Sequence, residues 1–289
     1  MTAKSGLPII RSTTITINVQ VIDLNQIALE KFAGRRRFEG KSVLITGGAA
    51  GMGLAAARMF ASEGARVSVV DIQKEAGHAL VEEIESNGGE AYFEAADLSV
   101  PDQTDQALEN LIKKMGGVDT LFNHAGTIIV KPFHETTDDD YDRLMDINLR
   151  SAFRVTRKVV NHMKDNGGGS IVVTASIGSG KAFVYESLYC ITKAAVLMLS
   201  NAIAVEYRDH GIRCNAVCPG FVKTAHGIRE IDELDGLGQH WQEADLAATQ
   251  VRICEPEEVA SAALFLASEE SSFINGSALY VDNGWFVKG

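Results

Sequence analysis

The 289-residue sequence predicts an α/β fold, and three observations support this fold class. Short apolar, β-branched runs alternate along the chain with longer Ala- and Leu-rich segments, which is the pattern of a parallel sheet covered by helices. A Gly-rich turn joins the first clear apolar run to the helix after it, and the next run ends in an acidic residue. By length alone, one large domain and two smaller ones are equally compatible with the chain.

The composition is that of an ordinary soluble protein, with 46% hydrophobic and 22% charged residues. A net charge of -11 and a pI near 5.1 argue against nucleic-acid and anionic-membrane partners, because both require a basic surface. No stretch is expected to reach the roughly 18 apolar residues of a membrane span. The cysteines form no metal-ligand cluster with histidine, so we expect no metal and reduced thiols in a cytoplasmic protein: Cys190, Cys214, Cys218 and Cys254.

Residues 1–38 are predicted to be an N-terminal extension that precedes the main fold. Within it, 14–21 alternates like a strand and 23–32 suits a short helix. Pro8 and Arg11 interrupt the apolar core that a secretory signal requires. Two interpretations stay open: an organelle transit peptide, and an arm that packs on a neighbouring subunit.

The first unit of the main fold is a buried strand at 42–46, a Gly-rich turn and a helix at 54–62. Glycines let the backbone turn tightly and approach a pyrophosphate, which the free N–H groups at the helix start stabilise: Gly47, Gly51 and Gly53. Asp71 ends the next strand, where a carboxylate accepts hydrogen bonds from an adenosine ribose and repels a 2′-phosphate. The simpler alternative, a turn that only starts a helix, does not account for Asp71. The sequence therefore predicts a dinucleotide site.

The alternation continues to the end of the chain. Asp97 follows a strand and is expected either to meet an adenine amino group or to cap the turn before Pro101. Asn148 lies in an apolar stretch of a long helix, where a buried amide needs partners. The segment 221–252 is polar with scattered apolar residues, which is typical of a lid over an active site. The expected elements are helices at 73–86, 102–115, 139–164, 187 onward and 257–268, and strands at 66–70, 90–95, 118–122, 171–174, 213–217 and 277–281.

A strand-loop-helix unit at 171–193 carries the candidate reactive groups. Tyr189 and Lys193 are four residues apart, so they share one helix face, and an ammonium beside a phenol lowers the phenol's pKa. Ser176 follows the strand, where open α/β sheets bind their ligands, so its hydroxyl is placed to hold the substrate oxygen. The alternative is a packed tyrosine, a solvated lysine and a turn serine.

Seven separated motifs together resemble the short-chain dehydrogenase/reductase family: Thr46-Gly-x-x-x-Gly-x-Gly53, Asp71 with Asp97, Asn123-x-Ala-Gly126, Asn148, Ser176, Tyr189-x-x-x-Lys193 and Pro219-Gly220. The resemblance covers about residues 38–289. It implies a doubly wound (Rossmann) parallel sheet of seven strands with helices on both faces, in a single domain at 39–289. Family members are mostly tetramers or dimers, so a homotetramer or homodimer is expected.

The resemblance also implies an activity and the roles of single residues. It implies an oxidoreductase that transfers hydride between NAD(H) and a secondary alcohol or ketone. Tyr189 is then the acid/base, Lys193 lowers its pKa and holds the nicotinamide ribose, Ser176 orients the substrate oxygen, and Asn148 supports a water-linked proton relay. The cofactor contacts expected are Thr46, Gly47, Gly51, Met52, Gly53, Asp71, Ile72, Asp97, Leu98, Asn123, Ala125, Gly126, Tyr189, Lys193, Pro219, Gly220, Val222 and Thr224.

Other features of the sequence set the limits of this interpretation. His124 stands where the family often has asparagine, and we expect a tolerated variant. The substrate contacts expected are Ser176, Val184 and Phe221, with Phe183, His226 and Trp241 as further candidates. A non-catalytic NAD(H)-binding regulator or scaffold on the same fold is the alternative function, and the intact Asn-Ser-Tyr-Lys set argues against it. An epimerase or dehydratase would usually need a longer C-terminal segment.

Overall fold

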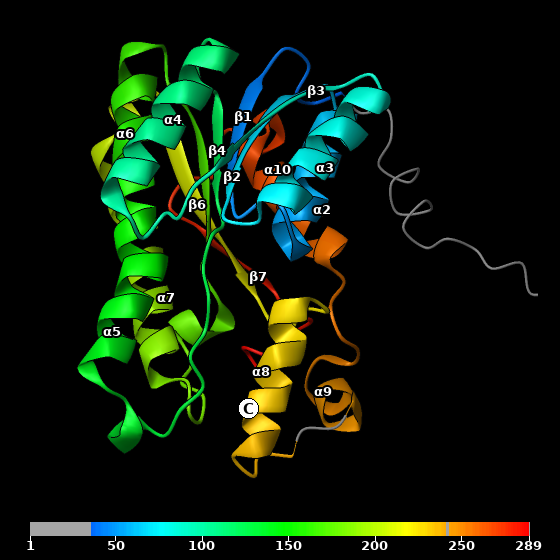
Figure 1. Ribbon diagram of the computed structural model, residues 1–289, viewed down its shortest axis with the longest axis vertical. Coiled ribbons are helices and arrows are strands. Elements are labelled where there is room, and N and C mark those ends of the chain that lie inside the picture. Colours follow the sequence, from blue (N-terminus) through cyan, green and yellow to red (C-terminus); the bar gives the residue numbers. More distant parts are fainter. Residues whose placement is uncertain (1–35, 241–242, 289) are drawn as a thin grey trace, which may run out of the picture.

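The computed structural model describes residues 36–240 and 243–288. In these ranges seven parallel strands form one sheet in the order β3-β2-β1-β4-β5-β6-β7 (Figure 1). The predicted seven-stranded parallel sheet is confirmed. The strands are β1 (Ser42–Thr46), β2 (Arg66–Asp71), β3 (Glu90–Ala95), β4 (Thr120–Asn123), β5 (Gly169–Thr174), β6 (Ile212–Pro219) and β7 (Ala278–Val281).

Helices cover both faces of this sheet, as a doubly wound fold requires. One face packs on α2 (Gly51–Ser62), α3 (Lys74–Ser86) and α10 (Pro256–Ala267), and the other on α4 (Pro101–Met115), α6 (Ser151–Asp165) and α7 (Ser187–Glu206) (Figure 1). Each face buries its own apolar cluster, because neighbouring residues of one strand point to opposite sides.

The strand order reverses at β1, which pairs with β2 on one side and with β4 on the other. Thr46 at the end of β1 is aligned with Val70 of β2 and with Asn123 of β4. The connections leave these strand ends in opposite directions. A ligand crevice is expected at this point of an open α/β sheet.

The expected single helix at 139–164 is in fact interrupted. Helix α5 (Asp138–Met145) passes through one π-helical turn (Asp146–Arg150) into α6. Inside this turn the Asn148 side chain hydrogen-bonds both the N–H and the carbonyl of Thr127. Just after the turn, the Ser151 hydroxyl donates a hydrogen bond to the carbonyl of Ile147. Helical periodicity does not reveal a one-turn widening of this kind, which is often found at functional sites.

Two helices, α8 (Ala225–Gly236) and α9 (Glu243–Gln250), lie beyond the carboxyl ends of the central strands (Figure 1). Thr224 caps α8 by accepting a hydrogen bond from the backbone of Gly227 at 3.0 Å. The Gln250 side chain is buried and bonds both the N–H and the carbonyl of Phe221, at 3.0 and 2.7 Å. This anchors the two ends of the segment 221–252 to each other. Its function as a lid stays a prediction, and Trp241 lies outside the described residues.

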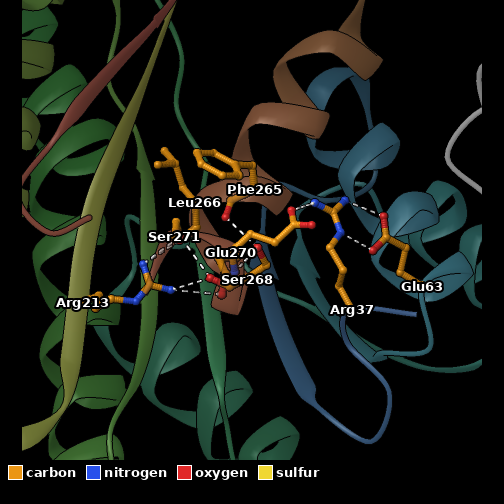
Figure 2. A network of polar contacts seen from close by, with 9 residues as sticks. Arg37, Glu63, Arg213, Phe265, Leu266, Ser268, Glu270 and Ser271 are labelled. Carbon is orange, nitrogen blue, oxygen red and sulfur yellow. Dashed lines mark hydrogen bonds and ion pairs between the residues drawn. The ribbon is translucent and has the colours of Figure 1, made fainter. Parts of the chain in front are cut away.

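The described chain begins with residues that are fixed to the core. The Arg37 guanidinium donates two hydrogen bonds of 2.6 Å to the buried carboxylate of Glu63 and one of 3.1 Å to Glu270 (Figure 2). Phe38 is buried against the ring of Phe60. Arg37 and Phe38, assigned above to the extension, thus pack on the main fold. The proposed extension otherwise lies outside the described residues.

Figure 2 also shows how the C-terminus of α10 is held. Arg213 of β6 donates to the carbonyls of Leu266 and Ser268 at 2.9 and 3.0 Å. The Leu266 carbonyl belongs to the last helical turn and the Ser268 carbonyl to the C-cap residue, and such carbonyls lack partners within the helix. The guanidinium therefore supplies the missing donors.

Helix α7 corrects one expectation from composition. By length and hydropathy it alone, among the described helices, could span a membrane. In the fold its residues Leu188, Thr192, Val196, Ser200 and Ala204 form a buried face, at the spacing of three to four that one helix face requires. This face is part of the cluster between α7 and β6, and a helix packed in a protein core meets the same criteria.

Candidate active site

A glycine cradle lies at the end of β1. Gly47 and Gly51 have left-handed φ values of +69° and +51°, which glycine adopts at little cost. A Cβ at Gly47 would lie 2.9 Å from the Cα of Ala125, and one at Gly53 would lie 2.0 Å from the carbonyl oxygen of Gly47. The backbone is therefore too close for any side chain here. Helix α2 begins in this cradle without a side-chain cap, so its first N–H groups face a ligand position.

The two acids of the predicted nucleotide site have different surroundings. Asp71 is buried, and its two carboxylate oxygens accept hydrogen bonds from the backbone N–H groups of Ala49 and Gln73, both at 2.9 Å. It is thereby held beside the glycine turn. Asp97 accepts hydrogen bonds from the backbone and the hydroxyl of Ser99, at 2.9 and 2.6 Å. Asp97 thus stabilises the turn before Pro101 without capping α4, and its contact with an adenine stays a prediction.

The side chains at the ends of β1 and β4 hold each other. The Thr46 hydroxyl donates to Asn123 at 3.0 Å and accepts from the backbone of His124 and Ala125 at 2.9 and 3.1 Å. The Asn123 amide donates to the carbonyl of Ala152 at 3.0 Å and to Thr156. Both side chains are satisfied within the protein. They shape the crevice, and a cofactor would meet the backbone that they fix.

Asn148 connects the loop after β4 to the helix that carries the tyrosine. Its amide oxygen accepts from the backbone N–H of Thr127 at 2.8 Å, and its nitrogen donates to the Thr127 carbonyl and to the Thr192 hydroxyl. Thr192 in turn donates to the backbone carbonyl of Tyr189 at 2.8 Å. The π-helical turn positions this amide and explains why it is buried.

Ser176, Tyr189 and Lys193 come together at the carboxyl end of β5. The Lys193 ammonium is 5.7 Å from the centre of the Tyr189 ring and donates to the Thr174 carbonyl at 2.8 Å. The Ser176 hydroxyl contacts the phenol and accepts from the backbone of Gly178 at 3.0 Å. The spacing of four on α7 therefore brings the phenol and the ammonium to one wall, as the sequence predicts.

The electrostatics of this group differ from the expectation. Burial raises the pKa of Tyr189, and the carboxyl groups of Glu230 and Glu186 raise it further, while the contact with Ser176 lowers it. Burial also lowers the pKa of Lys193 to about 8. The predicted lowering of the phenol's pKa by Lys193 is therefore not found in the protein alone, because desolvation disfavours both charged forms.

These groups line one cavity of about 680 Å³. It joins the glycine turn to the tyrosine and runs beneath α8. The predicted site residues that line it are Gly51, Met52, Ile72, Gly126, Ser176, Tyr189, Lys193, Pro219, Gly220, Phe221, Val222 and Thr224. Those that do not are Thr46, Gly47, Gly53, Asp71, Asp97, Leu98, Asn123, Ala125, Asn148 and Val184.

The backbone conformation at residues 183–185 determines which of these side chains faces the cavity. Tyr185 has a φ of +65°, and Val184 is 60% exposed on the outer surface. Phe183 lines the cavity instead and packs edge-on against Trp285, with ring centres 5.4 Å apart. No local pattern in the sequence predicts this reversal.

The cavity is also lined by residues from distant segments, and only some of them were predicted from the sequence. His226, named above as a candidate, does line the cavity, and burial lowers its pKa to about 4, so that it is neutral. His124 is neutral for the same reason, with a pKa of about 3, and its Nδ1 is 2.9 Å from the Thr174 hydroxyl. The lining residues that were not predicted include Glu186, Arg229, Glu230, Ile231, Leu234, Leu246 and Trp285.

Comparison with known proteins identifies the family. A family model described as enoyl-(acyl carrier protein) reductase matches residues 47–286. A cyclopentanol dehydrogenase of Comamonas testosteroni is 37% identical over 254 residues, covering 86% of this chain and 98% of that protein. The structure of levodione reductase superposes with a TM-score of 0.82 at 32% identity, covering 87% of this chain and 100% of the other.

A third likeness concerns a structure with ligands. A 7α-hydroxysteroid dehydrogenase complexed with NADH and 7-oxo glycochenodeoxycholic acid has a TM-score of 0.78 and 32% identity, and the match covers 86% of this chain and 96% of the other. Both neighbours share the Rossmann-like sheet described here. With the glycine turn and the clustered serine, tyrosine and lysine, these likenesses show that the chain belongs to the short-chain dehydrogenase/reductase family of oxidoreductases.

Proposed function

We propose that the protein is an NAD-dependent dehydrogenase that interconverts a secondary alcohol and its ketone. The observation that carries this proposal is the meeting of Ser176, Tyr189 and Lys193 on one wall of a cavity whose other end is the glycine turn. A general acid/base and a hydride acceptor must both reach one carbon atom of the substrate. This cavity has room for both.

Tyr189 is the proposed general acid and base. The Ser176 hydroxyl holds the substrate oxygen, and Tyr189 takes the hydroxyl proton during oxidation or returns it during reduction. A bound nicotinamide ring supplies the hydride acceptor or donor. Because burial keeps the phenol protonated at neutral pH, Tyr189 is suited to act as the acid in reduction there, and oxidation should gain from alkaline pH.

The residues present fit the proposed cofactor. The crowded glycine backbone and the uncapped start of α2 suit a pyrophosphate, and Ile72 beside Asp71 lines the cavity. The buried Asp71 supports NAD over NADP, because a carboxylate accepts from ribose hydroxyls and repels a 2′-phosphate. Lys193 and the backbone of Pro219 and Gly220 complete the proposed nicotinamide end.

The substrate class and the assembly are part of the same proposal. Cyclic secondary alcohols are proposed because the Comamonas relative is a cyclopentanol dehydrogenase and the cavity is mostly apolar. A cytoplasmic homotetramer or homodimer, without nucleic-acid, membrane or metal partners, is proposed as well. The exposed apolar residues Ile191, Met198 and Val205, seven apart on the outer face of α7, support a subunit contact there.

The test is Tyr189→Phe. Turnover of cyclic alcohols and ketones should fall at least about a hundredfold, the usual contribution of a general acid/base, while NADH affinity measured by fluorescence titration stays unchanged. Lys193→Ala should lose turnover and also bind NADH less tightly. Tyr207→Phe, the same change at the end of α7, is the matched control. Retention of more than about a tenth of the wild-type kcat in Tyr189→Phe would contradict the assigned role.

A further inference from the structure

Two carboxyl groups meet inside the cavity next to the tyrosine. Glu186 immediately precedes α7 and is 6% exposed, and Glu230 lies in the middle of α8. Both line the cavity, they share a hydrogen bond, and both interact electrostatically with the Tyr189 phenol. The proposed mechanism does not use them.

No cation neutralises this pair by direct contact in the part of the chain that the structure describes. The nearest guanidinium, that of Arg229, donates to the Thr127 hydroxyl at 3.1 Å and pairs with Glu233 at 3.5 Å. It offsets the charge of Glu230 only in part. A buried acid without a cationic partner is costly to a fold, so a ligand group that meets it has a physical role to fill.

The pair presents mainly hydrogen-bond acceptors to a ligand. Burial raises the pKa of both carboxyls, to about 7 for Glu186 and to about 8 for Glu230, where repulsion by Glu186 adds to the effect, so that the pair holds at least one proton near neutral pH. That proton is used in the contact between the two side chains. The remaining oxygen lone pairs face outward with roughly one negative charge. Hydroxyl groups match this surface, and carboxylates are repelled by it.

We propose that Glu186 and Glu230 form a specificity site for a second hydroxyl group of the substrate, so that a cyclic diol is preferred over the corresponding mono-alcohol. This inference rests on the proposed function and deepens it. The rest of the pocket around them is apolar, with Phe183, Phe221 and Leu246 available to contact a ring. Because both acids line the same cavity as the phenol, a second hydroxyl on the ring that carries the reacting one is the group expected to meet them.

The experiment compares kcat/KM with NAD⁺ for cyclohexanol, the cyclohexanediols and the monomethyl ethers of those diols. In the wild-type protein the best diol should exceed both cyclohexanol and its own methyl ether by about tenfold or more, the factor typical of a hydrogen bond to a charged group. The ether matters because it has nearly the same shape and lacks the second O–H donor. This comparison needs no variant.

The variants test which residues carry the preference. In Glu186→Gln/Glu230→Gln the ratio of kcat/KM for the diol to that for cyclohexanol should fall severalfold, and 3-hydroxycyclohexanecarboxylate should improve relative to cyclohexanol because the negative charge is gone. Asp232→Asn, the same change on the exposed side of α8, should leave every ratio as in wild type.

Several outcomes would overturn the proposal. Equal kcat/KM for diol and ether in the wild-type protein would exclude a donor-binding site. A preference for an aminocyclohexanol above every diol would show a site for a cation in place of a hydroxyl. Normal cyclohexanol oxidation with unchanged ratios in the double variant would remove this inference and leave the proposed function standing. Failure of the wild-type protein to oxidise any alcohol would remove both.

Discussion

At the residue scale, the site separates groups that bind ligands from groups that hold other residues. The side chains of Asn123 and Asp97 form hydrogen bonds with other residues of the protein, whereas Ser176 and Tyr189 line the cavity. Asp71 belongs to both groups. Its carboxylate supports the glycine turn through Ala49 and is also the residue proposed to choose between the two nicotinamide cofactors.

The first prediction concerns that choice. Wild-type kcat/KM should favour NAD⁺ over NADP⁺ by at least about a hundredfold, since a partly desolvated carboxylate facing a phosphate costs a few kcal/mol and each 1.36 kcal/mol is about tenfold. Asp71→Ala should narrow the gap mainly by weakening NAD⁺, as measured by steady-state kinetics with both cofactors. Asp97→Asn is the control and should preserve the ratio. Similar wild-type values for the two cofactors would remove the role assigned to Asp71.

The residues whose placement could be predicted from the sequence are those brought together by local spacing. The glycines, Tyr189 and Lys193 are examples, since one turn or one helix face brings them together. Glu186 and Glu230 were not predictable, because α7 and α8 meet only in the folded chain. The raised pKa of Tyr189 was missed for the same reason, as its largest cause is burial by distant segments.

At the element scale, α8 is the helix to which we assign substrate recognition. It carries Glu230 and His226 toward the cavity and is fixed at its start by Thr224. The polarity of the sequence predicts a lid at 221–252, which stays a prediction, and it does not predict the two helices of this segment. Periodicity in α8 is masked because the inward face mixes charged and apolar residues.

The raised pKa values of Glu186 and Glu230 predict a pH dependence of stability. The folded carboxyls of Glu186 and Glu230 keep protons to higher pH than the same groups in the unfolded chain, where the value is near 4.5. Between the unfolded value of 4.5 and the raised values of about 7 and about 8, the folded state binds more protons than the unfolded state. A rise in pH across this range therefore favours unfolding. The free energy of unfolding of the wild-type protein, measured in denaturant from about pH 5 to 9, should therefore fall relative to that of Glu186→Gln/Glu230→Gln. Parallel curves for the two proteins would contradict the raised values.

At the scale of the whole molecule, one buried ion pair fixes the first described segment to the core. Arg37→Met should destabilise the protein by about 3 to 5 kcal/mol, because it leaves the fully buried carboxylate of Glu63 without its partner. Chemical denaturation measures the loss. Arg37→Met/Glu63→Met should recover much of it, and Arg36→Met, which removes an exposed pair, should cost less than about 1 kcal/mol. If Arg37→Met lowered the free energy of unfolding by as little as Arg36→Met does, the buried pair would not contribute to stability.

The outer face of α7 provides the test of assembly. Met198 is 64% exposed between Ile191 and Val205, and an acid in an apolar subunit contact is strongly unfavourable. Met198→Glu should therefore reduce the mass observed by analytical ultracentrifugation. Val100→Glu adds the same charge at an exposed position beside α4 and should leave the mass unchanged. If the wild-type protein is a monomer, the outer face of α7 does not form a subunit contact.

The packing of α10 on α2 also has a consequence for how the chain reaches its fold. Both helices bury residues in the same cluster against β1 and β2, yet α10 begins about 200 residues after α2. Contacts between such distant segments form late and slowly, because a long loop must close first. During synthesis the surface of α2, β5 and β6 that α10 covers stays exposed until nearly the whole chain has been made. Cells that produce the protein must protect that surface for most of the time that translation takes.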